Sequence, residues 1–266
     1  MKLLFVGDIV GTAGMEALTS YLPYLKQTHR PQVTIVNAEN AADGRGLTEK
    51  LYKQILSLGV EAITLGNHSF DNRDLYNFIE GAKPLVRPAN LPATTPGKGI
   101  HYVRYNQYQV AVINVLGTVF MNPVTSPFLM IDELVDQARK QTPFIFVDCH
   151  AEATSEKLAL AHYLDGRVSA VVGTHTHVQT NDAKVLAGGT ASLTDVGMTG
   201  AQDSILGFAA KEVIQRFTSQ LPTRLVQESK GPLVLSACLI DLDDKTGLAK
   251  SIVPIQVTQE SLSKYY

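Results

Sequence analysis

Two histidines stand one residue apart in the segment Gly173-Thr174-His175-Thr176-His177. The segment follows the apolar, β-branched run 168–172, which is typical of a buried strand. Residues just past a strand end can be aimed by the rigid strand, and neutral imidazole is the commonest protein ligand for metal ions. The pair therefore indicates a metal site. On this segment alone, a polar loop whose histidines bind backbone groups is an equal alternative.

Four further apolar runs end in residues with similar chemistry. The runs are 3–6, 33–36, 62–65 and 144–147, and the candidate ligands after them are Asp8, then Glu39 with Asn40, then Asn67 with His68, then His150. Taken singly, each has an ordinary explanation, such as helix capping by a carboxylate. Together, two carboxylates, two amides and four imidazoles form a set of metal ligands.

The charges in this set favour two metal ions over one. Asp8 and Glu39 supply a charge of −2, and neutral imidazoles add none. Two divalent ions would leave a balance of about +2, which suits a bound hydroxide together with a phosphate ester anion. Two metals about 3.5–4 Å apart clamp the attacking and leaving oxygens of an in-line displacement. The sequence therefore predicts phosphoryl chemistry.

The elements that must position these residues alternate between strands and helices. Helices are predicted at 11–27, 48–58, 71–80, 131–140, 154–163 and 211–217, with Thr48 and Thr154 as N-caps. Residues 101–105 and 108–115 predict a hairpin, residues 84–99 a long connection, and 191–193, 233–242 and 251–257 further strands. Since parallel strands joined by helices bind ligands beyond their carboxyl ends, all the candidate ligands are expected at one sheet edge.

This order predicts an α/β fold, a layered sandwich with a parallel or mixed central sheet, flanking helices and antiparallel C-terminal strands. We expect one domain over residues 1–266, with a small inserted subdomain at about 84–127 as the alternative.

Composition limits the partners and the compartment. The chain has 266 residues, 45% of them hydrophobic, and a net charge of −2, so stable nucleic-acid binding is not expected. No apolar run approaches the ~18 residues that span a bilayer, and membrane association is not expected. Two cysteines, Cys149 and Cys238, make no disulfide framework, which predicts the reducing cytoplasm. A homo-oligomer is compatible with the sequence.

The order of the strand-end motifs resembles that of the calcineurin-like metallophosphoesterases. The tightest matches are Gly66-Asn67-His68 and the segment 173–177. The chain more closely resembles the YmdB-type bacterial family of cyclic-nucleotide phosphodiesterases, over nearly its whole length. The stretches that carry this likeness are 37–42, 87–90, 150–157, 174–180 and 194–200.

The resemblance implies a role for each candidate. Glu39 would bridge two metals, and His68 would protonate the leaving oxygen rather than bind metal. One metal would be held by Asp8 and His177, and the other by Asn67, His150 and His175. The implied reaction is hydrolysis of 2′,3′- and 3′,5′-cyclic nucleotides by a metal-bound hydroxide. Iron or manganese is the implied metal, and zinc is compatible with the same ligands.

The chain departs from the wider superfamily at Val10, where a histidine ligand is usual. The amide oxygen of Asn40, or water, would then complete the first metal. Two other functions stay open: a phosphomonoesterase such as a nucleotidase, and a regulatory protein that binds nucleotide or RNA with little turnover. His68 argues against the second, because a binding protein needs no general acid.

Four further residues have less certain roles near the predicted site, and two of them have two alternative roles. Asp71 either orients the ring of His68 or caps a helix, and Asn90 either contacts substrate or orders its loop. Asp195 is expected to support the site from behind the ligands, and Cys149 to point into the packing.

Overall fold

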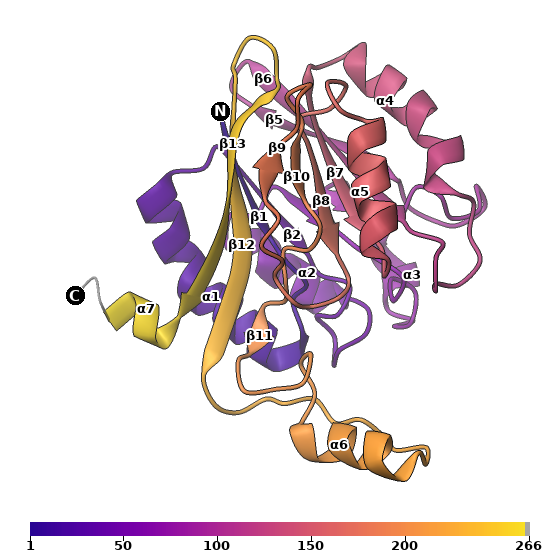
Figure 1. Ribbon diagram of the computed structural model, residues 1–266, viewed down its shortest axis with the longest axis vertical. Helices are drawn as coiled ribbons and strands as arrows, with labels where there is room; N and C mark the ends of the chain where they lie inside the picture. The colour runs from indigo at the N-terminus through magenta and orange to yellow at the C-terminus, as the bar shows by residue number, and fades with distance from the viewer. Residues whose placement is uncertain (264–266) are drawn as a thin grey trace.

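Two facing β-sheets form the centre of the molecule. The computed structural model describes residues 1–263, and Figure 1 shows helices outside the strand layers, with α4 and α5 on one side and α1 on the other. The first sheet has the order β11-β12-β1-β2-β3-β4, with β13 paired to β12. Its strands are β1 Lys2–Val6, β2 Val33–Asn37, β3 Ala62–Thr64, β4 Leu85–Val86, β11 Gly200–Ala201, β12 Leu233–Leu242 and β13 Ala249–Thr258.

The second sheet has the order β5-β6-β7-β8-β10-β9. Its strands are β5 Ile100–Tyr105, β6 Tyr108–Leu116, β7 Phe144–His150, β8 Ala170–Thr174, β9 Lys184–Val185 and β10 Ala191–Leu193. Within it, β6, β7, β8 and β10 are parallel, as are β1 to β4 in the first sheet. Both sheets therefore end their parallel strands in edges that can hold ligands.

Three apolar cores explain why the strands are continuous hydrophobic runs. Leu3 and Phe5 of β1 pack between the sheets, where the ring of Phe5 lies 4.8 Å from that of Phe146. Leu4 and Val6 point the other way, into the core under α1 (Gly11–His29) and α2 (Glu49–Ser57). A third core lies between the second sheet and α4 (Ile131–Arg139) and α5 (Thr154–Tyr163). Strands buried on both faces lose the apolar–polar alternation of half-exposed strands.

The predicted α/β sandwich is confirmed, including its antiparallel C-terminal strands, since β12 pairs antiparallel with both β1 and β13. The expectation of one sheet edge was wrong in one respect, because the ligand-bearing strands divide between two sheets. Apolar runs show that strands are buried, but they do not show which strands pair. Residues 84–127 supply β4, β5 and β6 to both sheets, and the division into domains stays a prediction.

Three local predictions were wrong. The helix at 71–80 is reduced to α3, Leu75–Phe78, because Asn72 accepts a bond from the N–H of Asp74 and competes with helix formation. The long connection at 84–99 hides β4. Thr154 is not an N-cap, since α5 already begins there and Ala153 stands before it, whereas the Thr48 hydroxyl does cap α2.

The other helices are α6 Ala210–Ser219, α7 Gln259–Ser263 and the short 3₁₀ helix η1 Pro127–Leu129. Across the described residues, none of the helices is both long and apolar enough to cross a membrane.

Candidate metal centre

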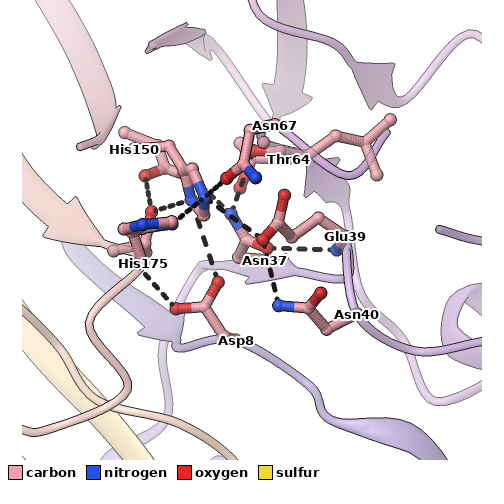
Figure 2. A network of polar contacts seen from close by, with 12 residues as sticks. Asp8, Asn37, Glu39, Asn40, Thr64, Asn67, His150 and His175 are labelled. Atoms are coloured by element: carbon pink, nitrogen blue, oxygen red, sulfur yellow. Dashed lines mark hydrogen bonds and ion pairs between the residues drawn. The ribbon is translucent and has the colours of Figure 1, made fainter. Parts of the chain in front are cut away.

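The predicted ligands of both sheets meet where the parallel strands end. Figure 2 shows side chains that follow β1, β2 and β3 facing side chains from the ends of β7 and β8. The residues brought together are Asp8, Glu39, Asn40, Asn67, His150, His175 and His177. The sequence thus predicted a set of residues that the fold gathers in one place, although their roles as ligands stay a prediction.

His150 lies at the centre of this cluster. Its Nε2 is 2.9 Å from the Asn67 amide oxygen, 3.2 Å from a Glu39 carboxylate oxygen and 3.0 Å from Nδ1 of His175. One ring nitrogen donates at most one hydrogen, so it cannot satisfy all three neighbours. Donor atoms of Glu39, His150 and His175 lie within 4.8 Å of one another. A cation among them would satisfy all these lone pairs.

The contacts of the other ring nitrogen of His150 indicate the tautomer of the neutral ring. The Thr174 hydroxyl donates to Asp148 at 2.7 Å, and its oxygen lies 2.8 Å from Nδ1 of His150. Because a hydroxyl carries one hydrogen, Nδ1 of His150 must donate to it. In the neutral ring, Nε2 is then a bare lone pair facing Asn67, Glu39 and His175, as a metal ligand requires.

Asp8 supplies an oxygen that no hydrogen bond satisfies, although Nδ1 of His150 lies 3.8 Å from it. Its Oδ2 accepts the backbone N–H of His175 at 3.1 Å, while its buried Oδ1 has no hydrogen-bond partner. Burial raises the pKa of Asp8, against the opposing charge of His177. Leaving a buried carboxylate oxygen unpaired is costly, and a bound cation removes that cost. The donor set and this orphaned oxygen both fit a metal site.

A second group of donors lies beside the first. The Asn40 amide nitrogen is 3.0 Å from Glu39 Oε1 and 3.2 Å from Nε2 of His177. Nδ1 of His177 donates to the Leu206 carbonyl at 3.0 Å, so in the neutral ring Nε2 carries a lone pair, which here accepts from the Asn40 amide. In this orientation the amide nitrogen of Asn40 faces His177, and ligation by its oxygen needs the amide turned over. Val10 is buried nearby and provides no donor.

Charge is unevenly shared among the ligands. Burial raises the pKa of Glu39, but the charge and hydrogen bond of His150 outweigh burial and lower the pKa to about 2. Burial lowers the pKa of His150, and the neighbouring Glu39 and Asp8 carboxylates raise it to about 9. Burial and the charge of His150 lower the pKa of His175 to about 3. The carboxylates of Glu39 and Asp8 therefore favour positive charge at the centre of the cluster.

The loop that carries His175 and His177 is held in an unusual backbone conformation. Their φ angles are 104° and 65°, a left-handed region that side chains with a Cβ seldom adopt. Asp195 fixes the loop by accepting bonds from the N–H and hydroxyl of Thr176, at 2.9 and 2.7 Å, and it is paired with the buried Lys157 at 2.8 Å. Asp195 thus supports the loop from behind the ligands.

His68 lies beside the ligands without joining their shared contacts. Its backbone N–H donates to Glu39 at 2.9 Å, and its Nδ1 lies 2.8 Å from Oδ2 of Asp71. Asp71 therefore orients the ring of His68 and does not cap α3. His68 opens onto a pocket of about 290 Å³. The pocket is lined by Val10, Glu39, Asn40, Gly44, Arg45, His68, Glu152, His175, Thr176, His177, Leu206, Phe208 and Leu225.

One residue at the site, Glu152, escaped the sequence reasoning. Glu152 Oε2 lies 3.1 Å from Nε2 of His175, on the side away from the ligand cluster. Its position two residues after His150 was the available signal. Asn90, by contrast, lies outside the pocket lining: its buried amide bonds Leu116 and Thr125, so it orders its loop. Cys149 points into the packing, as predicted.

The fold is that of the calcineurin-like phosphoesterases. A calcineurin-like phosphoesterase from Bacillus subtilis matches it with a TM-score of 0.61 at 12% identity, over 97% of this chain and 90% of that one. The relatives described below, a phosphodiesterase at 51% identity and a phosphatase at 33% identity, identify the protein as a metallophosphoesterase. A family model described as YmdB-like protein matches residues 4–255, and the chain belongs to the YmdB-like family.

Two relatives are similar over almost the whole chain. A 2′,3′-cyclic-nucleotide 2′-phosphodiesterase of Bacillus subtilis (strain 168) is 51% identical over 262 residues, which is 98% of this chain and 99% of the relative. The crystal structure of a novel phosphatase from Mycoplasma pneumoniae matches with a TM-score of 0.90 at 33% identity, over 99% of this chain and 96% of that one. The predicted family is thereby confirmed.

Proposed function

We propose that the protein hydrolyses 2′,3′-cyclic nucleotides, and 3′,5′-cyclic nucleotides at the same site. The observation that carries the proposal is the convergence of Glu39, Asn67, His150 and His175. Of these, Glu39 and His175 line the pocket together with His68. The name of the Bacillus subtilis relative at 51% identity supports the 2′,3′ substrate class.

The donors suit two metal ions of intermediate softness, with iron or manganese preferred and zinc compatible. Asn67, His150 and His175 would hold one ion, Asp8 and His177 the other, with Asn40 as a further ligand and Glu39 shared. Metal ions so placed provide a nucleophile at neutral pH and stabilise the charge on the phosphoryl oxygens. Oδ1 of Asp8, which is buried and has no hydrogen-bond partner, would be stabilised by such a charge.

His68 completes the reaction as a proton donor. Hydrolysis of a 2′,3′-cyclic phosphate adds the oxygen of water to phosphorus and breaks the P–O2′ bond, so O2′ must gain a proton. Asp71 holds Nδ1 of His68, which leaves Nε2 as the atom that delivers the proton. The product is then the nucleoside 3′-phosphate.

A phosphomonoesterase remains the second candidate function. The relative from Mycoplasma pneumoniae is described as a phosphatase, and it is 33% identical to this chain. The same ligands would serve both reactions, because both require stabilisation of a phosphoryl group. The identity of the hydrolysed bond separates them.

The test is a product analysis with the metal-reconstituted protein. We expect adenosine 2′,3′-cyclic phosphate to yield adenosine 3′-phosphate, with slower release of inorganic phosphate, and adenosine 3′,5′-cyclic phosphate to be opened as well. Phosphorus NMR resolves these products. Rapid phosphate release from adenosine 3′-phosphate, with both cyclic substrates untouched, would show that the phosphomonoesterase function is the correct one.

We also propose the cytoplasm as the compartment of this activity. Cys149 and Cys238 are both buried and unpaired, which agrees with a reducing environment. Stable nucleic-acid binding is not needed for the reaction, and a homo-oligomer is compatible with it.

A further inference from the structure

A protruding segment forms one wall of the pocket. Residues 202–228, here named the arm, contain α6, which stands away from the sheets beyond β11 in Figure 1. Two backbone bonds close the root of the arm: the N–H of Ala209 donates to Val226 at 2.8 Å, and that of Glu228 donates to Gly207 at 2.9 Å. The arm is therefore a closed unit and not a loose loop.

The root of the arm packs closely against the loops that follow β1 and β2. A Cβ on Gly207, whose φ is +93°, would lie 2.6 Å from a methyl group of Val10. The side chain of Gln227 fills the space that a Cβ on Gly11 or Gly44 would occupy. All three glycines also have a positive φ, +56° at Gly11, +81° at Gly44 and +93° at Gly207, which side chains with a Cβ seldom adopt. The arm is thus held in a fixed position relative to the ligand cluster.

The arm contributes only apolar side chains to the pocket. Leu206, Phe208 and Leu225 line it, and each is partly exposed. The carbonyl of Leu206 also binds Nδ1 of His177, which ties this wall to a candidate ligand. The polar lining, including His68 and Arg45, comes from elsewhere in the chain. The apolar wall thus lies beside the proposed metal centre, where a phosphate would bind. This arrangement suits a ligand that is anionic at one end and flat and apolar at the other.

We propose that the arm binds the nucleobase of the substrate, with Phe208 as the stacking surface and Leu206 and Leu225 beside it. This inference rests on the proposed function. Stacking on an aromatic ring is tolerant of base identity, because every base has a π-face. No side chain that the arm places in the pocket can form hydrogen bonds, and such groups are what strong discrimination requires. The enzyme therefore accepts purines and pyrimidines alike.

The arm also offers a matched control. Phe217 on α6 is 78% exposed and is not among the pocket-lining residues, so Phe217→Ala removes the same ring from the same arm without touching the pocket. Phe208→Tyr keeps an aromatic face and is the conservative rescue. Leu225→Ala is a second pocket variant if Phe208→Ala disturbs the arm.

The experiment compares four nucleoside 2′,3′-cyclic phosphates, carrying adenine, guanine, cytosine and uracil, with the base-free 1-O-methylribose 2,3-cyclic phosphate. In the wild type we expect kcat/KM to agree within about tenfold across the four bases and to fall about 5- to 150-fold without a base. We call the difference in kcat/KM between substrates with and without a base the gap. Phe208→Ala should remove most of the gap, because it should lower kcat/KM for the nucleotides alone. Phe208→Tyr and Phe217→Ala should keep the gap.

Calorimetric binding of adenosine 3′-phosphate and of base-free ribose 3-phosphate gives a readout that is independent of turnover, and Phe208→Ala should weaken only the first. Equal losses on substrates with and without a base would overturn the subsite, as would a wild type that shows no gap or prefers one base by 100-fold. A wild type that hydrolyses none of the cyclic phosphates overturns the proposed function instead, while preferential binding of adenosine 3′-phosphate through Phe208 would still support the subsite.

Discussion

The hydroxyl of Thr174 joins the ring of His150 to the carboxylate of Asp148. The oxygen lies 2.8 Å from Nδ1 of His150, and the hydroxyl hydrogen points to Asp148 at 2.7 Å. Asp148 is in turn bound by the Asn37 amide at 3.0 Å, and burial raises its pKa to about 6. This chain of contacts fixes the tautomer of His150, so that Nε2 is available to a metal.

Thr174→Val should therefore weaken metal binding while keeping the shape of the strand. We expect a loss of about 10- to 100-fold in affinity, the range measured when partners of ligating histidines are removed. The buried Asp148 also loses a donor, which costs about 1–3 kcal/mol of stability. Chelator competition gives the affinity and thermal unfolding the stability. Thr174→Ser keeps the hydroxyl and is the control, and unchanged affinity in Thr174→Val would exclude the role of Thr174 in positioning His150.

Much of the fold and site could be predicted because buried strands and the polar residues that follow them form recognisable local sequence patterns. Strands buried on both faces are continuous apolar runs, and the polar residues that end them, such as Asp8 and His150, stand out by contrast. The contacts that join His150, Thr174 and Asp148 could not be predicted in this way, because Thr174 and Asp148 are strand residues 26 positions apart in the sequence. Glu152 likewise gains meaning only once His175 lies 3.1 Å away.

The wrong helix at 71–80 shows a different limit. Its composition favoured a helix, but Asp71 is bound to His68, and Asp74 accepts the N–H of Glu49 from another element. Side chains committed to such contacts hold the backbone in turns, and α3 keeps only four residues. Local propensity cannot anticipate a partner that the fold brings from elsewhere.

Metal analysis should find two ions per chain after reconstitution. The reason is that the donors form two adjacent groups, one around His150 and one around His177, with Glu39 in contact with both His150 and Asn40. Asn67→Ala should reduce the content toward one ion, while the exposed Asn77→Ala should keep both. Because metal binds the folded state, chelation should also lower the melting temperature. Elemental analysis that finds a single ion in the reconstituted wild type would rule out the two-metal site.

Acid should weaken the protein partly through Asp182. Burial raises its pKa, but hydrogen bonds from Thr194 and Thr180 lower it below its ordinary value. A carboxyl whose pKa is lower in the folded state stabilises the fold above its unfolded pKa, and the effect is lost as the pH falls through the folded pKa. Asp182→Asn should therefore lower the melting temperature most near pH 7 and least near pH 3. The exposed Asp203→Asn is the control, and a deficit that is the same at both pH values would exclude this titration.

His68→Ala tests the proton donor. His68 does not share the contacts that join Asn67, Glu39 and His175 to His150, so both metals should remain when its ring is removed. Turnover of cyclic nucleotides should fall about 10²- to 10⁴-fold, the usual effect of losing a general acid. An aryl phosphodiester should lose much less, because its phenolate leaving group needs no proton. Asp71→Asn, which keeps a side chain beside the ring but removes its charge, should show a milder form of the same pattern. Loss of metal together with the ring would instead make His68 a ligand, and equal losses on aryl and nucleoside substrates would give it a role in substrate binding.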